Sequence, residues 1–319
     1  CNIIMLLDII LFIIGAALVV FGADWLVNGA SAIARRSGLS EYVIGATIVG
    51  IGTSMPEFVV SAIASLEGNA DIAIGNVAGS NAFNTLLILG VTALILPLHY
   101  TRRNIRTDVP MCIGVSAALL LAALFFGNGA RTVNRVEGII LFAGFIAYLL
   151  WCIRSGKDEH QEQEGEKEHL TLWKALLLIA AGLCGLIFGG ELFVDSASSI
   201  AGRFGVPESV IAATMVAGGT SLPELAVCVV AALKGREQMA IGNIIGSNIS
   251  NILLIIGFAA TVSANPLNVD SVNMTGIWTA FLSSIILMFS AFPLRTATLS
   301  RWKGLVFLAF YAAYVAMIL

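Results

Sequence analysis

Long apolar stretches recur along the whole chain, and they constrain its fold more than any other feature. A helix crosses a bilayer core of about 30 Å with roughly 17–25 mainly apolar residues. Ten stretches of this 319-residue sequence are of that kind, and they cover residues 4–28, 40–66, 72–97, 109–127, 136–153, 171–196, 207–233, 238–262, 274–292 and 302–318. Because lipid offers no hydrogen-bond partner to the backbone, the sequence predicts an all-α integral membrane protein with ten transmembrane helices.

The composition agrees with a chain surrounded by lipid. Hydrophobic residues make up 58% of the sequence and charged residues 12%, whereas about 25% of the residues of an average soluble domain are charged. We expect membrane lipid as a partner, and neither nucleic acid nor an obligate protein partner.

The basic residues are distributed unevenly between the predicted connections. Lys and Arg accumulate in the cytoplasmic loops of membrane proteins. The odd-numbered connections hold 14 of the 17 basic residues, whereas the even-numbered ones hold Arg131, Arg135 and Arg203. We therefore expect a multi-pass protein of the cell (inner) membrane with both termini outside the cytoplasm.

A polar segment, residues 154–170, separates two apolar halves. It contains six acidic residues, but it lacks the ligand spacing and the central glycine of an EF-hand calcium loop. We interpret it as a cytoplasmic acidic linker between a first five-helix repeat, residues 1–153, and a second five-helix repeat, residues 171–319.

The two halves are related by an internal repeat with an offset of 167 residues, the separation of Gly52 and Gly219. The segment GTSMPE at 52–57 recurs as GTSLPE at 219–224, and GNVAGSNAFN at 75–84 recurs as GNIIGSNISN at 242–251. An odd number of spans in each half makes the second half enter the membrane from the opposite side, so the sequence predicts inverted repeats. Such repeats place the substrate site near the bilayer midplane.

Glu57 and Glu224 lie inside apolar spans, where an ionisable side chain costs at least about 2.5 kcal/mol and marks a functional site. Each glutamate follows a proline, and a proline breaks a helix because it cannot donate a backbone hydrogen bond. The backbone carbonyls freed by the break are tolerated where they line a cavity. Each half therefore offers a carboxylate with nearby carbonyl and hydroxyl oxygens, from Thr53 and Ser54 or from Thr220 and Ser221. Oxygen ligands of this kind suit calcium or sodium rather than zinc or copper.

The glycine-rich segments supply further polar groups. Helical spacing places Ser80 and Asn84 on one face, and likewise Ser247 and Asn251. One copy alone would fit close helix packing equally well, but two copies beside two Pro-Glu breaks favour an ion site. Asp24 and Glu191 are equivalent acids near the ends of their predicted spans, and we expect helix-end or gating roles for them.

These paired motifs resemble the alpha repeats of the calcium/cation antiporter superfamily, nearest its prokaryotic sodium/calcium exchangers, and the resemblance covers nearly all ten spans. It implies that the long helices of the first and sixth spans slide across a core of eight helices. It also implies calcium ligation by Glu57, Glu224 and the carbonyls of Thr53 and Thr220, with sodium sites that use Ser54, Ser80, Ser221 and Ser247. Some relatives, including potassium-dependent ones, have aspartate at the position of Asn251, so the two amides Asn84 and Asn251 argue against potassium co-transport.

We interpret the chain as a secondary antiporter that exchanges sodium for calcium by alternating access, with no enzymatic activity and no cofactor. A proton/calcium exchanger of the same fold is the main alternative, because burial favours the neutral form of a carboxyl group; the site serines favour sodium. A cation channel fits broken helices in an inverted repeat less well. An intramembrane enzyme fits worst, because the motifs HExxH and GxSxG are absent from the sequence. The sequence also has no P-loop, which argues against a primary pump contained in this chain.

Overall fold

The computed structural model describes residues 2–125, 131–155, 170–206, 217–292 and 297–318. The first half contains helices α1 (Asn2–Ser37), α2 (Glu41–Ile44), α3 (Gly50–Thr53), α4 (Met55–Leu66), α5 (Asp71–Ala82), α6 (Leu89–Ile95), α7 (Val109–Phe125) and α8 (Arg135–Ser155). The second half contains α9 (Leu172–Arg203), α11 (Ala217–Gly219), α12 (Leu222–Leu233), α13 (Glu237–Ser250), α14 (Gly257–Val262), α15 (Ser271–Ser290) and α16 (Arg301–Ile318). Short π-helical segments interrupt these helices at η1 (Gly45–Val49), η2 (Phe83–Ile88), η3 (Asn104–Asp108) and η5 (Asn251–Ile256).

The helices are those of a membrane protein, as the sequence predicts. By length and composition, the described part of the chain contains seven helices able to cross a membrane, or eight if the pair 41–53 and 55–66, bent by 47°, counts as one broken span. The predicted span 207–233 is described only from residue 217, where α12 is a shorter apolar helix. The linker 154–170 lies outside the described residues except at its ends, so its role and the division into two five-helix repeats stay predictions.

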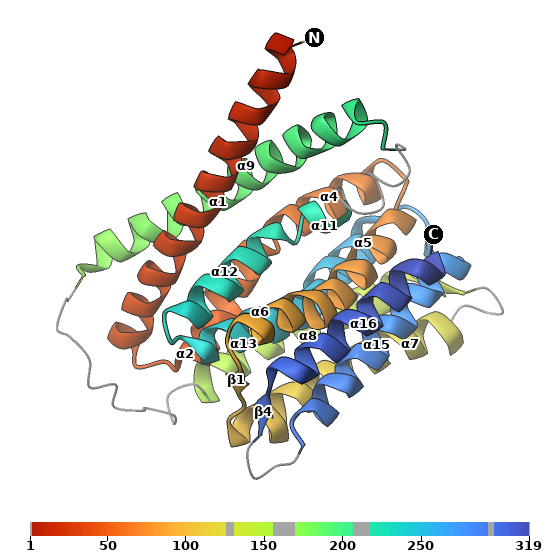
Figure 1. The fold of residues 1–319 in the computed structure, drawn as a ribbon. Coiled ribbons are helices and arrows are strands. Elements are labelled where there is room, and N and C mark those ends of the chain that lie inside the picture. The colour runs from red at the N-terminus through yellow and green to blue at the C-terminus, as the bar shows by residue number, and fades with distance from the viewer. Residues whose placement is uncertain (1, 126–130, 156–169, 207–216, 293–296, 319) are drawn as a thin grey trace.

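The long helices α1 and α9 cross each other at one side of the molecule (Figure 1). Glycines let their backbones touch. A Cβ atom added at Gly22 would lie 2.8 Å from the backbone nitrogen of Leu186, and one added at Gly182 would lie 2.6 Å from the backbone nitrogen of Leu26. Small residues at helix crossings are the usual means of close packing in membranes, so α1 and α9 form one closely packed pair.

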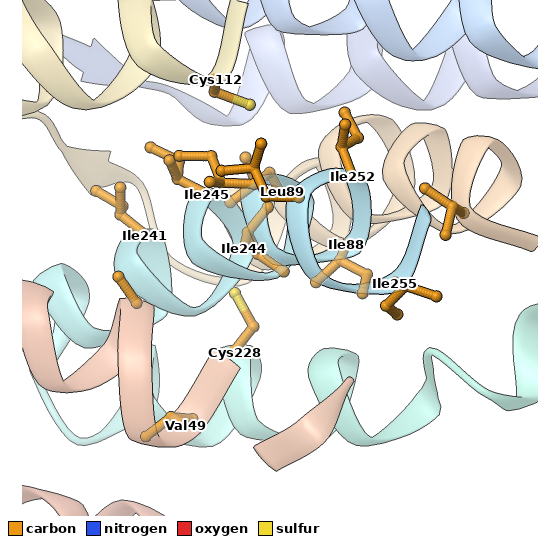
Figure 2. Packing of buried hydrophobic residues seen from close by; sticks show 14 of the residues in the cluster. Val49, Ile88, Leu89, Cys112, Cys228, Ile241, Ile244, Ile245, Ile252 and Ile255 are labelled. Carbon is orange, nitrogen blue, oxygen red and sulfur yellow. The ribbon is translucent and has the colours of Figure 1, made fainter. Parts of the chain in front are cut away.

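Helix α13 lies at the centre of the remaining helices, and each of its residues from Met239 to Ser250 is buried. Figure 2 shows its isoleucines between Cys112 of α7 and Cys228 of α12. Its glycines Gly242 and Gly246 face the backbone of α2 and η1 so closely that an added Cβ atom would overlap the carbonyl oxygens of Tyr42 and Ala46. This packing holds α13 against the chain that leads into the first helix break.

Two short antiparallel ribbons join the halves. Strand β1 (Leu98–His99) pairs with β4 (Thr298–Leu299), and β2 (Thr132–Val133) pairs with β3 (Leu267–Asn268). Each ribbon takes one strand from each half of the chain, so both halves contribute to both ribbons.

Candidate ion-binding site

Two helix breaks place Glu57 and Glu224 in the interior. The chain bends by 47° between α3 and α4, with Ser54 at the bend and Pro56 in the first turn of α4. In the second half, Thr220 and Ser221 form a turn before α12, which has its proline in the same place. The predicted breaks are therefore confirmed. The side chains of the two glutamates are buried, with exposed fractions of 1% and 0%.

The two breaks are joined by crossed hydrogen bonds. The Ser54 hydroxyl donates to Oε1 of Glu224, and the Ser221 hydroxyl donates to Oε1 of Glu57, each over 2.9 Å. The two bonds are equivalent under the 167-residue offset. Each carboxylate is therefore held by the other half of the chain, and this brings the two motifs of the repeat into direct contact.

A network of four asparagines in the two glycine-rich segments links α5 and η2 to α13 and η5. The amino group of Asn251 donates to Oδ1 of Asn81 over 3.0 Å. The equivalent bond runs from the amino group of Asn84 to Oδ1 of Asn248 over 3.2 Å. All four residues are at least 98% buried. Asn84 and Asn251 are thus held by their amino groups, which leaves their oxygens available.

The buried polar atoms that have no hydrogen-bond partner in the described structure include four carboxyl and amide oxygens of predicted site residues. They are Oε2 of Glu57 and Glu224 and Oδ1 of Asn84 and Asn251. They form two pairs that are equivalent under the repeat, and with both glutamates ionised all four atoms are acceptors only. A buried polar group without a partner costs several kcal/mol by transfer estimates of about 2–7 kcal/mol. A cation relieves this cost at acceptor oxygens, and carboxylate and amide oxygens are ligands that Ca²⁺ and Na⁺ accept.

The other predicted residues occupy the same region with less uniform surroundings. The Thr53 hydroxyl donates to Oδ1 of Asn243 over 3.2 Å, and the Ser247 hydroxyl donates to the carbonyl of Gly50 over 3.1 Å. Oγ1 of Thr220 is buried with no partner among the described residues. Ser80 is buried as well. The roles of all these groups, and of the Thr53 and Thr220 carbonyls, as ion ligands stay predictions.

Sequence reasoning missed the asparagines that support the site. Asn76 donates to the backbone carbonyl of Glu57 over 3.1 Å, and the equivalent Asn243 donates to that of Glu224 over 3.3 Å. Together with Asn81 and Asn248 they occupy both remaining asparagine positions of each glycine-rich segment. The sequence feature that could have identified these asparagines is their recurrence, in both halves, as polar residues inside apolar spans.

The expectation that Asp24 and Glu191 lie near helix ends is wrong. Helix α1 continues from Asp24 to Ser37, and α9 continues from Glu191 to Arg203. Asp24 instead pairs with Lys234, whose Nζ lies 2.6 Å from Oδ1 of Asp24. This contact ties α1 to the end of α12.

Comparison with known proteins agrees with this arrangement. The sequence matches the family described as sodium/calcium exchanger protein over residues 7–154 and 174–319. The chain belongs to the sodium/calcium exchanger family. It is 30% identical to the sodium/calcium exchanger MaX1 of Methanosarcina acetivorans over 98% of both chains, and 35% identical to the inner membrane protein YrbG of Escherichia coli over 81% of both chains. A structure of the sodium-calcium exchanger NCX_Mj, soaked with 10 mM Na⁺ and zero Ca²⁺, is 34% identical and superposes with a TM-score of 0.82 over 98% of this chain and 99% of that chain. The resemblance identified from the paired motifs is thereby confirmed.

Proposed function

We propose that this family member exchanges Na⁺ for Ca²⁺ across the cell (inner) membrane, with Glu57 and Glu224 as the shared ion-binding carboxylates. The observation that carries the proposal is the crossed pair of serine–glutamate bonds, which leaves one oxygen of each buried glutamate without a donor in the described structure. The names of MaX1 and NCX_Mj, both sodium/calcium exchangers, support the choice of ions. The name of YrbG supports the inner membrane.

The proposed site can bind either Ca²⁺ or Na⁺, but not both kinds of ion at once. Two carboxylates in a buried site repel each other, and a bound cation removes that repulsion. Ca²⁺ balances both charges, whereas Na⁺ ions balance them singly and use hydroxyl and amide oxygens as well. Because both kinds of ion need Glu57 and Glu224, binding of one displaces the other. Exchange follows when the loaded site opens to alternate sides.

The two long helices make different contacts with the opposite half of the chain. Helix α1 packs along α12, whereas the equivalent helices α9 and α4 hardly touch within their described residues. The predicted topology, with the odd-numbered connections in the cytoplasm, supports a cytoplasmic position for the α1–α12 contact. We therefore assign this arrangement to a state that is closed toward the cytoplasm.

The decisive experiment measures ⁴⁵Ca²⁺ uptake into proteoliposomes that contain the purified protein. An outward Na⁺ gradient at equal pH should drive uptake, and a pH gradient without Na⁺ should not. Uptake that follows the pH gradient and ignores Na⁺ would replace the proposal with proton/calcium exchange. Downhill Ca²⁺ flux without any counter-ion would indicate a channel.

A further inference from the structure

In the asparagine network, a backbone carbonyl fixes the hydrogen-bond direction at Asn81. The carbonyl of Asn248 can only accept, and it receives the amino group of Asn81 over 3.0 Å. The other end of the Asn81 amide, Oδ1, therefore faces Asn251 and needs a donor. Asn251 meets this need with its amino group over 3.0 Å. Its own Oδ1 must then point the other way, where it is buried without a donor in the described structure.

The other half has a similar arrangement with a different inner partner. The amino group of Asn248 donates to Oγ1 of Thr85 over 2.7 Å, and its Oδ1 accepts the amino group of Asn84 over 3.2 Å. A hydroxyl can donate as well as accept, so the direction is fixed by an acceptor-only partner at Asn81 alone. Oδ1 of Asn84 is left buried and without a donor among the described residues. Asn81 and Asn248, here called the inner asparagines, thus each hold the amide of an outer asparagine, which is Asn251 or Asn84.

We propose that Asn81 and Asn248 are positioning residues that turn the amide oxygens of Asn251 and Asn84 toward the transported cation. An amide has an oxygen on one side and an amino group on the other, and only the oxygen attracts a cation. Without the inner asparagine, the outer amide can rotate by half a turn and present its amino group to the ion. The inner residues act through the outer ones and need not contact the ion. This inference rests on the proposed function and identifies what orients its ligands.

The test compares amides with carboxylates, which have oxygen on both sides and therefore no wrong orientation. Asn81→Ala should raise the KM for Na⁺ about fivefold, the size of one lost hydrogen bond, with little change in kcat. In an Asn251→Asp background, where Oδ1 of Asn81 faces an acceptor instead of a donor, the same substitution should not raise that KM. Asn248→Ala, alone and with Asn84→Asp, is the equivalent pair in the other half and serves where the first pair folds poorly.

Equal losses in both backgrounds would show a merely structural role for the inner asparagines, and no loss in either would show no role. Both outcomes overturn the inference. Sodium-driven exchange by the unmodified protein, measured in parallel, separates this failure from failure of the proposed function itself.

A second inference comes from the contact between α1 and α12. Nζ of Lys234 lies 2.6 Å from both Oδ1 of Asp24 and Oδ1 of Asn28, and Asn28 donates to Asp24 over 3.0 Å. The 167-residue offset converts this set of three residues into three acids, Glu67, Glu191 and Asp195. The turns are equivalent in backbone too, because the glycines that follow Glu67 and Lys234 have φ angles of +89° and +70°.

The opposite state of an inverted-repeat transporter arises when the two halves exchange their conformations. Every contact between the halves is then replaced by its equivalent. The attraction between Lys234 and Asp24 would become a repulsion of Glu67 from Glu191 and Asp195. We infer that Lys234, Asp24 and Asn28 form a latch that favours the state closed on the side of Lys234.

The latch can be tested by spin labels at Ser37 and Leu233, both exposed near the ends of α1 and α12, in a cysteine-free background. Lys234→Gln should increase the population with a long label distance about two- to fivefold, the range for a solvent-exposed ion pair. Glu67→Lys should do the same, because it creates the missing ion pair in the opposite state. Glu67→Gln, which removes one repulsive charge without adding a partner, should have a smaller effect.

Exchange of the charges by Asp24→Lys with Lys234→Asp should restore the original distance distribution. A distribution that stays unchanged in both Lys234→Gln and Glu67→Lys would overturn the latch. The latch would also be overturned if the charge-exchanged protein had the same label distances as the single variants. None of these residues belongs to the ion site, so Na⁺-driven exchange should persist in all of them.

Discussion

The contact between α1 and α9 allows a direct test of the structure through Gly22→Ala. A Cβ atom at this position would lie 2.8 Å from the nitrogen of Leu186, 2.9 Å from the carbonyl oxygen of Gly182 and 3.0 Å from the carbonyl carbon of Gly185. Non-bonded carbon contacts prefer about 3.5–4.0 Å. All three neighbours are backbone atoms, so no side-chain rotation relieves the overlap and the helices must separate.

Two opposing effects determine how much Gly22→Ala changes the free energy of unfolding. Overpacking costs about 1–3 kcal/mol, while replacing glycine by alanine in a helix gains up to about 1 kcal/mol. Gly114 provides the matched control, because it is exposed in the middle of α7 and an added Cβ atom meets no described atom within 4 Å. Gly114→Ala changes helix propensity alone. The difference between the two variants therefore isolates the steric cost, about 1–3 kcal/mol.

The assay is denaturation of the purified protein in mixed micelles, followed by circular dichroism. Gly22→Ala should unfold at lower denaturant than the unmodified protein, and Gly114→Ala at equal or higher denaturant. Gly189→Ala, the equivalent substitution in α9, should behave like Gly22→Ala because its Cβ atom would lie 2.6 Å from Cβ of Leu18. Equal stability of Gly22→Ala and Gly114→Ala would refute the close backbone contact.

Three further outcomes are expected. Glu57→Gln and Glu224→Gln should each abolish Ca²⁺ transport in a folded protein, because a neutral amide cannot balance a divalent ion in a buried site; near-normal flux in either variant would remove that residue from the site. A cysteine placed in the linker 154–170 should resist an impermeant thiol reagent in intact cells, and labelling there would contradict the predicted topology. Exchange of three Na⁺ for one Ca²⁺ moves a net charge worth about 2.3 kcal/mol per 100 mV, so the final Ca²⁺ gradient should follow a clamped membrane potential; a gradient that ignores the clamp would indicate two-for-one exchange.

The repeat makes much of the site predictable from the sequence. Comparison of the two halves locates the breaks at Pro56 and Pro223 and the glutamates that follow them. It cannot show which groups of the two halves meet. Ser54 bonds Glu224 rather than the nearby Glu57, and this crossing depends on how the halves pack. The pairing of Asp24 with Lys234 is hidden for the same reason.

The missed role of Asn81 has a local cause. Regular helical spacing groups Ser80 with Asn84, but α5 ends at Ala82 and the chain continues as the π-helical segment η2. A π-helical turn contains an extra residue and shifts the side chains that follow it. The same change occurs at η5, which begins at Asn251. The shift changes how Asn84 and Asn251 face the asparagines that precede them, and no residue pattern in either segment announces it.

Because the ion site is nearly symmetric, it cannot by itself determine which of the two conformational states is preferred. Glu57 with Asn84 and Glu224 with Asn251 offer equivalent atoms to an ion that arrives from either side. A ligand shifts a conformational equilibrium only by its different affinities for the two states, and a symmetric site offers little difference. A preference for one state must then come from residues at which the halves differ. Lys234 and its counterpart Glu67 differ in the sign of their charge, and Lys234 contacts the long helix α1 through Asp24, so this contact can favour one state without changing the ion ligands.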